Sequence, residues 1–251
     1  MNSGRMDQES VRTFLPALRR RLQFFRGRQH RVNARQFSKE KVREAWVLKT
    51  AILHRTAAEF YRQMRDWPVR EVWSLCEQLL RSGASAELHI ALDWAYRRRR
   101  EFVKSDFRRF EAWLKKYVKD WSGCDDLCTR ALGAFLYAYP ESATETEAWT
   151  RSHNRWVRRA AAVVLIYSLR RGRLLPQALR VAERLLLDED DLVQKGYGWM
   201  LKEASRAYPQ QVFRFVMAHK ETMPRTVLRY AIEKLPDSQR RKAMLRTTKK
   251  K

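Results

Sequence analysis

Glycine and proline divide the chain into a series of helix-length segments. The 251 residues include only 8 Gly and 7 Pro, and most of these fall between segments with helical periodicity. No segment shows sustained alternation of apolar and polar residues, so we predict an all-α chain without strands. The predicted helices cover residues 41–64, 69–81, 85–102, 106–121, 125–139, 144–152, 155–171, 176–187, 191–208, 210–219 and 225–235.

Two of these segments have the same sequence character. Residues 157–162 and 193–198 match at an offset of 36. Helix pairs that recur at roughly 35–45 residues are typical of HEAT-like repeats, which stack so that corresponding helices line one concave wall. We therefore predict an α-solenoid over residues 41–240 and a basic tail over 241–251. Residues 1–40 are expected to form a basic arm or helix, and a solvated arm is the favoured form.

The charge of the chain narrows its possible partners. A formal net charge of +25 accompanies 45% hydrophobic residues and nine tryptophans, which is typical of a folded basic protein and not of a disordered one. Such proteins most often bind nucleic acid, and an anionic membrane surface is the alternative. We find neither a membrane-spanning apolar run nor a secretion signal, and three cysteines cannot pair completely. A cytoplasmic, nucleoid-associated protein is expected.

The predicted helix over residues 191–208 carries a tryptophan among cations. On a helical wheel Lys195, Lys202 and Arg206 surround Trp199, opposite the apolar stripe. This arrangement suits a nucleic-acid backbone, with the indole free to meet a base or sugar. Alternatively, a neighbouring helix covers Trp199.

A second candidate site begins at Trp121. Asp125 and Asp126 follow it where we expect a helix to begin. Two carboxylates in that position can cap the helix and complement its dipole. In so basic a protein, an acidic pair near a tryptophan could instead hold a cationic ligand group.

Two arginines share a face of the helix predicted over residues 155–171. Arg155 and Arg159 stand one turn apart above Ala162. A solvated face is one interpretation. The other is a phosphate clamp, because guanidinium forks match phosphate oxygens.

Metal and nucleotide chemistry are not indicated. The histidines are scattered, and Cys124 and Cys128 have no second pair to close a zinc site. The sequence also lacks a Gly-rich phosphate loop and a GxSxG elbow. We expect neither a metal nor a cofactor.

Four motifs, taken in order, resemble the DNA alkylation repair glycosylases of the AlkD type. The resemblance runs from about Trp67 to Arg241 and is most specific in the last two motifs. The motifs are WSGCDDLC at 121–128, NRWVRRAA at 154–161, DLVQKGYGWMLKEA at 191–204 and MPRTVLRYAIEKLP at 223–236.

The resemblance implies a function and a set of site residues. Members of this family use a basic concave face of HEAT-like repeats to hold duplex DNA, and they excise cationic N3- and N7-alkylated purines without flipping the lesion. By motif, Trp121, Asp125 and Trp199 correspond to the catalytic residues and Arg159 to the arginine of the R-A-A helix. The neighbouring Asp126 leaves the register of the carboxylate open. Without a candidate lysine nucleophile, we expect a monofunctional enzyme. We also expect it to be a monomer.

Three other functions are compatible with the sequence. A catalytically silent relative would bind DNA through shape and charge alone. A helical-repeat scaffold would bind a protein partner, and fold alone does not decide function. A membrane-surface protein would use the arm around Phe24 and Phe25.

Overall fold

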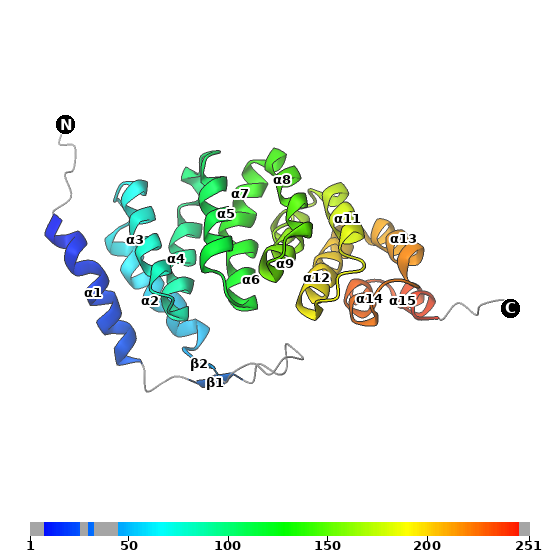
Figure 1. Cartoon of the computed structure of the whole chain (residues 1–251), viewed down its shortest axis with the longest axis horizontal. Coiled ribbons are helices and arrows are strands. Elements are labelled where there is room, and N and C mark those ends of the chain that lie inside the picture. Colours follow the sequence, from blue (N-terminus) through cyan, green and yellow to red (C-terminus); the bar gives the residue numbers. More distant parts are fainter. Residues whose placement is uncertain (1–7, 26–29, 33–44, 246–251) are drawn as a thin grey trace. The chain divides into compact units, whose positions relative to one another are not determined.

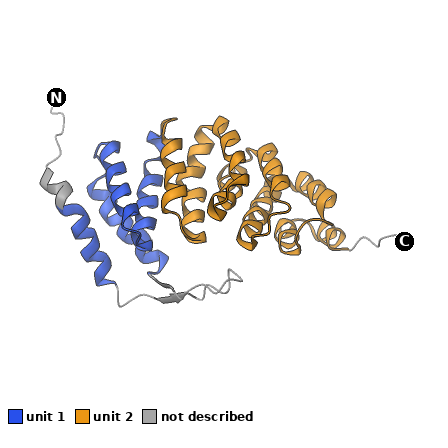
Figure 2. Cartoon of the chain, in the orientation of Figure 1, with its two compact units in different colours: residues 1–102 blue, residues 103–251 orange. Residues whose placement is uncertain are grey.

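The computed structural model describes residues 8–25, 30–32 and 45–245 of the protein. The chain divides into two compact units, residues 1–102 and 103–251 (Figure 2). Helices make up most of the described residues of both units (Figure 1), which confirms the predicted class of helical-repeat fold. Residues 1–7, 26–29, 33–44 and 246–251 lie outside the description, and so does most of the predicted C-terminal tail.

Unit 1 begins with a helix that is partly buried, which corrects the expectation of a solvated arm. Phe14, Leu15 and Leu18 are buried within it. The ring of Phe14 lies 5.5 Å from that of Phe60 and 5.1 Å from that of Trp67, so this apolar face joins the core of the unit. The helices of unit 1 are α1 (Gln8–Phe24), α2 (Thr50–Gln63), α3 (Val69–Arg81), α4 (Ser85–Arg97) and the short η3 (Arg99–Glu101).

A small antiparallel ribbon corrects the prediction that the chain has no strands. Strand β1 (His30–Val32) pairs with β2 (Ala45–Val47), with His30 opposite Val47. Helix α2 consequently begins at Thr50, although periodicity predicted a helix from residue 41. Three-residue strands are too short to show alternation, and their pairing partner is distant in sequence, so the pattern missed them.

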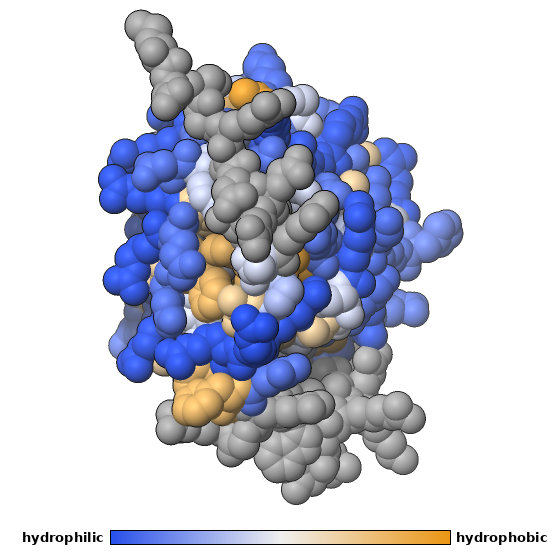
Figure 3. Space-filling model, turned by 90° about the vertical axis from the view of Figure 1, so that its left-hand side faces the viewer, coloured by the Kyte–Doolittle hydropathy of each residue, from blue (hydrophilic) through white to orange (hydrophobic). Residues whose placement is uncertain are grey.

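The end of unit 1 that carries α1 is mainly hydrophilic. In Figure 3 the described part of this face is mostly hydrophilic, with hydrophobic side chains near its middle and at its lower edge. Phe24 is 67% exposed, whereas Phe25 belongs to a buried cluster with Leu48 and Leu53. None of the described helices is both long enough and apolar enough to cross a bilayer.

In unit 2, four helices form a row in which each packs against the next. These are α6 (Trp121–Thr129), α9 (Arg155–Val163), α12 (Asp191–Ala207) and α14 (Arg225–Ile232), and Figure 1 shows them following one another along the unit. The remaining helices of the unit are α5 (Asp106–Tyr117), α7 (Ala131–Ala138), η4 (Pro140–Ser142), α8 (Ala143–Glu147), η5 (Ala148–Arg151), α10 (Ile166–Leu169), α11 (Leu175–Arg184), α13 (Pro209–His219) and α15 (Asp237–Met244). Helix α15 thus extends past residue 240, where we predicted the tail to begin.

The predicted repeat is visible in the way α9 and α12 begin. The side chain of Asn154 caps α9 by accepting a hydrogen bond from the Trp156 amide at 2.9 Å. The side chain of Asp190, 36 residues later, caps α12 by accepting from the Leu192 amide at 2.9 Å. The offset found in the sequence therefore relates two neighbouring, equivalently capped helices.

Candidate active site on α6, α9 and α12

Trp121 and Asp125 lie on the same side of α6, one turn apart. The cap of this helix is Asp120, whose carboxylate accepts a hydrogen bond from the Gly123 amide at 2.8 Å. The predicted helix boundary at residue 125 was therefore wrong, and Asp125 does not serve as the N-cap. Both Trp121 and Asp125 are half-buried within the helix, so Asp125 needs another structural explanation.

That explanation is Arg159 of α9. Its Nε and Nη2 donate to the two carboxylate oxygens of Asp125 at 2.8 and 2.9 Å, which makes a bidentate ion pair. Its Nη1 donates to the carbonyl of Leu192 at the start of α12. Arg159 is only 6% exposed, so it is neither part of a solvated face nor a surface phosphate clamp in this structure. It joins α6, α9 and α12 at one point.

The environment of the pair affects both of its groups. Burial raises the pKa of Asp125 above its ordinary value, and the hydrogen bonds from Arg159 offset part of this rise. Burial alone would lower the pKa of Arg159, but hydrogen bonding to Asp125 reverses that effect and raises it. The guanidinium therefore stays charged, and Asp125 is a carboxylate that is partly withdrawn from water.

Gly196 of α12 allows Arg159 to reach Asp125. A Cβ atom at position 196 would lie 3.1 Å from the Cγ of Arg159 and 3.3 Å from its Nη1. Gly198 faces the other neighbour of α12, where a Cβ would lie 3.0 Å from the Cβ of Tyr230. The two glycines thus permit close packing of α12 on both α9 and α14.

Trp199 is half-buried and held by polar neighbours, so it is neither fully covered nor freely solvated. Its indole N–H donates to Glu203 Oε1 at 3.2 Å. The guanidinium carbon of Arg170 lies 5.9 Å from its ring centroid, and the Nε of Arg170 donates to Glu203 Oε2 at 3.0 Å. Glu203 is buried, and hydrogen bonds from Arg170 and Trp199 outweigh the effect of burial and lower its pKa.

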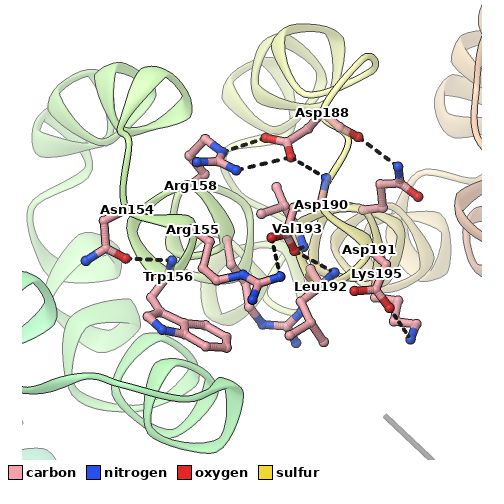
Figure 4. Close-up of polar contacts among 12 residues, drawn as sticks. Asn154, Arg155, Trp156, Arg158, Asp188, Asp190, Asp191, Leu192, Val193 and Lys195 are labelled. Carbon is pink, nitrogen blue, oxygen red and sulfur yellow. Dashed lines mark hydrogen bonds and ion pairs between the residues drawn. The ribbon is translucent and has the colours of Figure 1, made fainter. Parts of the chain in front are cut away.

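The cations that we expected around Trp199 are paired with carboxylates of the chain. Lys195 lies 3.1 Å from Asp191, Lys202 lies 2.7 Å from Glu233, and Arg206 lies 3.3 Å from Glu203. Arg155 likewise pairs with Asp190 (Figure 4), beside the pair formed by Arg158 and Asp188 at 2.7 Å. For these cations, and for Arg159, binding to DNA stays a prediction that would require sharing or exchanging partners.

Asp126 points to a different partner from Asp125. Its carboxylate pairs with Arg130 one turn further along, at 3.2 Å. The arginine of α9 therefore selects Asp125, although the two acids are adjacent in sequence. Cys124 and Cys128 are both buried on this helix, where Cys124 Sγ approaches the Trp156 carbonyl at 3.5 Å.

The sequence reasoning missed Glu203 and Arg170. Glu203 lies one turn after Trp199, and Arg170 lies on the same face as Arg159, three turns later by helical periodicity. Those two spacings were the available signals. In the sequence alone, however, Glu203 resembles an ordinary surface acid, so neither spacing distinguishes it.

Comparison with known proteins identifies the chain. A family model described as DNA alkylation repair enzyme matches residues 18–235. The chain belongs to the DNA alkylation repair enzyme family. The match starts well before Trp67, so it includes part of α1, where we had found no family pattern. Membership identifies the protein as a DNA repair enzyme.

A solved structure supports the fold of this DNA alkylation repair family member. It is described as a predicted DNA alkylation repair enzyme from Enterococcus faecalis. The two chains are similar with a TM-score of 0.66 and 16% identity, over 74% of this chain and 86% of the other. No curated protein matches the sequence.

Proposed function

We propose that the protein is a monofunctional DNA glycosylase that hydrolyses the N-glycosidic bond of cationic N3- or N7-alkylated purines in duplex DNA, without flipping the lesion. The observation that carries the proposal is the half-buried carboxylate of Asp125, which Arg159 orients and which shares a helix face with Trp121. This arrangement supports stabilisation of a positive charge at an aromatic-lined surface.

The reaction depends mainly on stabilising a positive charge. Alkylation at N3 or N7 makes the purine a cationic leaving group, and the deoxyribose becomes oxocarbenium-like as the bond breaks. A carboxylate about 4 Å away would stabilise this charge by up to about 4 kcal/mol at an effective dielectric near 20. If the attraction acts mainly in the transition state, it amounts to roughly a thousandfold in rate. The positive charge of Arg159 offsets part of it.

Each residue then has a defined role. Asp125 keeps lone pairs available, because the two hydrogen bonds from Arg159 occupy only two of about four lone-pair positions on its oxygens. Trp121 and Trp199 flank the sugar and add roughly 0.5–2 kcal/mol of cation–π attraction. Arg159 is a positioning residue.

The test is single-turnover excision from a duplex that carries one N7-methylguanine. We expect the wild type and Asp126→Asn to release the base and Asp125→Asn to bind the duplex without releasing it. Release by Asp125→Asn at the wild-type rate would refute the assigned role. If the wild type binds the duplex but releases neither this base nor N3-methyladenine, the protein is instead a silent DNA-binding relative.

A further inference from the structure

A turn at the end of α10 brings two arginines to the same side of the chain. Gly172 adopts a positive φ of 69°, the Arg173 amide donates to the Ser168 carbonyl at 3.0 Å, and the Gly172 amide donates to the Leu169 carbonyl at 3.0 Å. These two bonds form a Schellman motif with glycine in the left-handed position. The motif reverses the chain, so that Arg171 and Arg173 flank the turn.

Both guanidinium groups lie over tyrosine rings. The guanidinium carbon of Arg171 is 3.6 Å from the ring centroid of Tyr167 and 5.6 Å from that of Tyr137. That of Arg173 is 4.5 Å from the Tyr137 centroid. The two rings contact each other edge to face, with centroids 5.9 Å apart. Two cations therefore converge on a shared aromatic platform made by α7 and α10.

These two arginines differ from their neighbours in their lack of acidic partners. Arg170 pairs with Glu203 at 3.0 Å, and Arg180 pairs with Glu147 at 2.6 Å. Both side chains are exposed, and neither Arg171 nor Arg173 makes an ion pair among the described residues. Within the described part of the chain, Arg171 uses one donor, in a bond from Nη1 to the Tyr167 carbonyl at 2.8 Å. No carboxylate of that part therefore compensates the positive charge of the two arginines.

We propose that Arg171 and Arg173 form a second DNA-contact site, which binds backbone phosphates away from the reacting sugar. A guanidinium stacked on a ring is restricted in rotation, yet its N–H donors point outward from the edge of the plane, where they match phosphate oxygens. Unlike the cations near Trp199, these two need not give up a carboxylate to bind an anion.

The position of the site fits a contact along the same duplex. Helices α9 and α10 follow one another closely, and the Val164 amide still donates to the Ala160 carbonyl at 3.0 Å between them. As one continuous helix, residues 159–169 would rise by roughly 15 Å, at about 1.5 Å per residue, and Arg171 lies just beyond the end of α10. A duplex lying alongside these helices would span that distance with about four to five base pairs at about 3.4 Å each. The proposal rests on the proposed function only in taking DNA as the ligand.

The experiment compares the affinity of two double variants for an undamaged duplex over a range of salt concentrations, by fluorescence anisotropy. Arg171→Gln with Arg173→Gln removes two predicted phosphate contacts. We expect affinity to fall roughly 10- to 50-fold at about 0.1 M salt, and the slope of log K against log salt to become less steep by about 1.8. Arg151→Gln with Arg214→Gln removes the same net charge from two other exposed arginines of unit 2 and is the matched control.

The outcomes are distinct. An unchanged affinity and slope, or an equal loss in the control, would overturn the site. Wild-type affinity in a variant with Tyr137→Leu and Tyr167→Leu would overturn the role of the rings as a platform. Binding to undamaged DNA does not depend on base release, so this measurement is decisive even if the wild type shows no glycosylase activity.

Discussion

Gly196 and Arg159 pack so closely that a Cβ atom at position 196 would press against the arginine side chain. The distance of 3.1 Å from a Cβ at position 196 to Arg159 Cγ is tighter than ordinary van der Waals contact. The glycine of α12 therefore leaves room for the arginine of α9 in its ion pair with α6. The family motif around Trp199 thus contains both an aromatic group and the space that the neighbouring arginine needs.

We predict that Gly196→Ala displaces Arg159 and lowers excision. Overpacking of this kind lowers the free energy of unfolding by about 1–3 kcal/mol, and the higher helix propensity of alanine returns about 1 kcal/mol of it. Gly198→Ala is the matched control, since its Cβ would meet Tyr230 at 3.0 Å and Val227 Cα at 3.3 Å on the side of α14. Denaturant unfolding and single-turnover excision are compared. If both variants lose excision to the same degree, the effect is general packing and not displacement of Arg159.

Asp125→Asn is expected to reduce stability as well as excision. Removing one partner of a buried ion pair typically lowers the free energy of unfolding by about 3–5 kcal/mol. We expect a loss below this range, because asparagine keeps one acceptor for Arg159 and burial already disfavours the ionised form of Asp125, as its raised pKa indicates. Asp126→Asn breaks a pair with Arg130, which follows the last residue of α6 and whose side chain is 22% exposed against 7% for that of Arg159, so we expect a smaller loss of stability. Urea titration of both variants provides the measurement. Equal stability of the two would contradict the buried ion pair.

The rate of excision should show an acidic limb due to Asp125. Burial raises the pKa of this carboxyl above the ordinary value of 3.8, so the ionised form should be reached only at a higher pH. Single-turnover rates, corrected for uncatalysed release, should therefore rise with pH through a midpoint above 3.8. Asp126→Asn should lower that midpoint slightly while keeping the acidic limb, because the negative charge of Asp126 contributes to the raised pKa. A rate already at its maximum at pH 3.8 would exclude ionisation of a raised Asp125 as the controlling step.

The raised pKa of Asp125 also predicts how the free energy of unfolding depends on pH. Because its folded-state pKa is raised, the folded protein holds this proton more tightly than the unfolded chain does. The contribution of this carboxyl to the free energy of unfolding is complete below its pKa in the unfolded chain, near 3.8. It is lost as pH rises through its pKa in the folded protein. The difference in unfolding free energy between wild type and Asp125→Asn should change with pH in that window, which urea titrations at several pH values would reveal.

Glu203→Gln should lower the rate of excision by misplacing Trp199. We expect it to lower the free energy of unfolding no more than a comparable substitution elsewhere does. The substitution weakens the links from Glu203 to Arg170 and Arg206 that hold the acceptor of the indole in place. We expect excision to fall about tenfold or more, since a misplaced aromatic group loses part of its cation–π attraction. Glu147→Gln is the control, because Glu147 is equally buried and pairs with Arg180 and Arg184. Similar excision in the two variants would assign Glu203 a purely structural role.

Much of the fold could be predicted from local patterns. Most helix positions, the glycine that ends α10 and the offset between α9 and α12 all follow from residues close in sequence. The errors have local causes too. The cap at Asp120 was overlooked, so the start of α6 was placed too late, and the break at Arg130, where φ is −122° and ψ is −91°, was not expected. The buried face of α1 was obscured by the many arginines around it.

The sequence by itself determined the helical class, the repeat, the family and the spacing of Trp121 and Asp125, because these depend on backbone hydrogen bonds and motifs within a few residues of each other. Tertiary structure alone decided which charges meet. Arg159 pairs with Asp125 rather than Asp126, and Arg170 pairs with Glu203, over separations of 34 and 33 residues. Such choices depend on how α6, α9 and α12 pack, and on the free energy of leaving a buried charge without a partner. The periodicity of a single helix gives no information on how the helices pack or on that free energy.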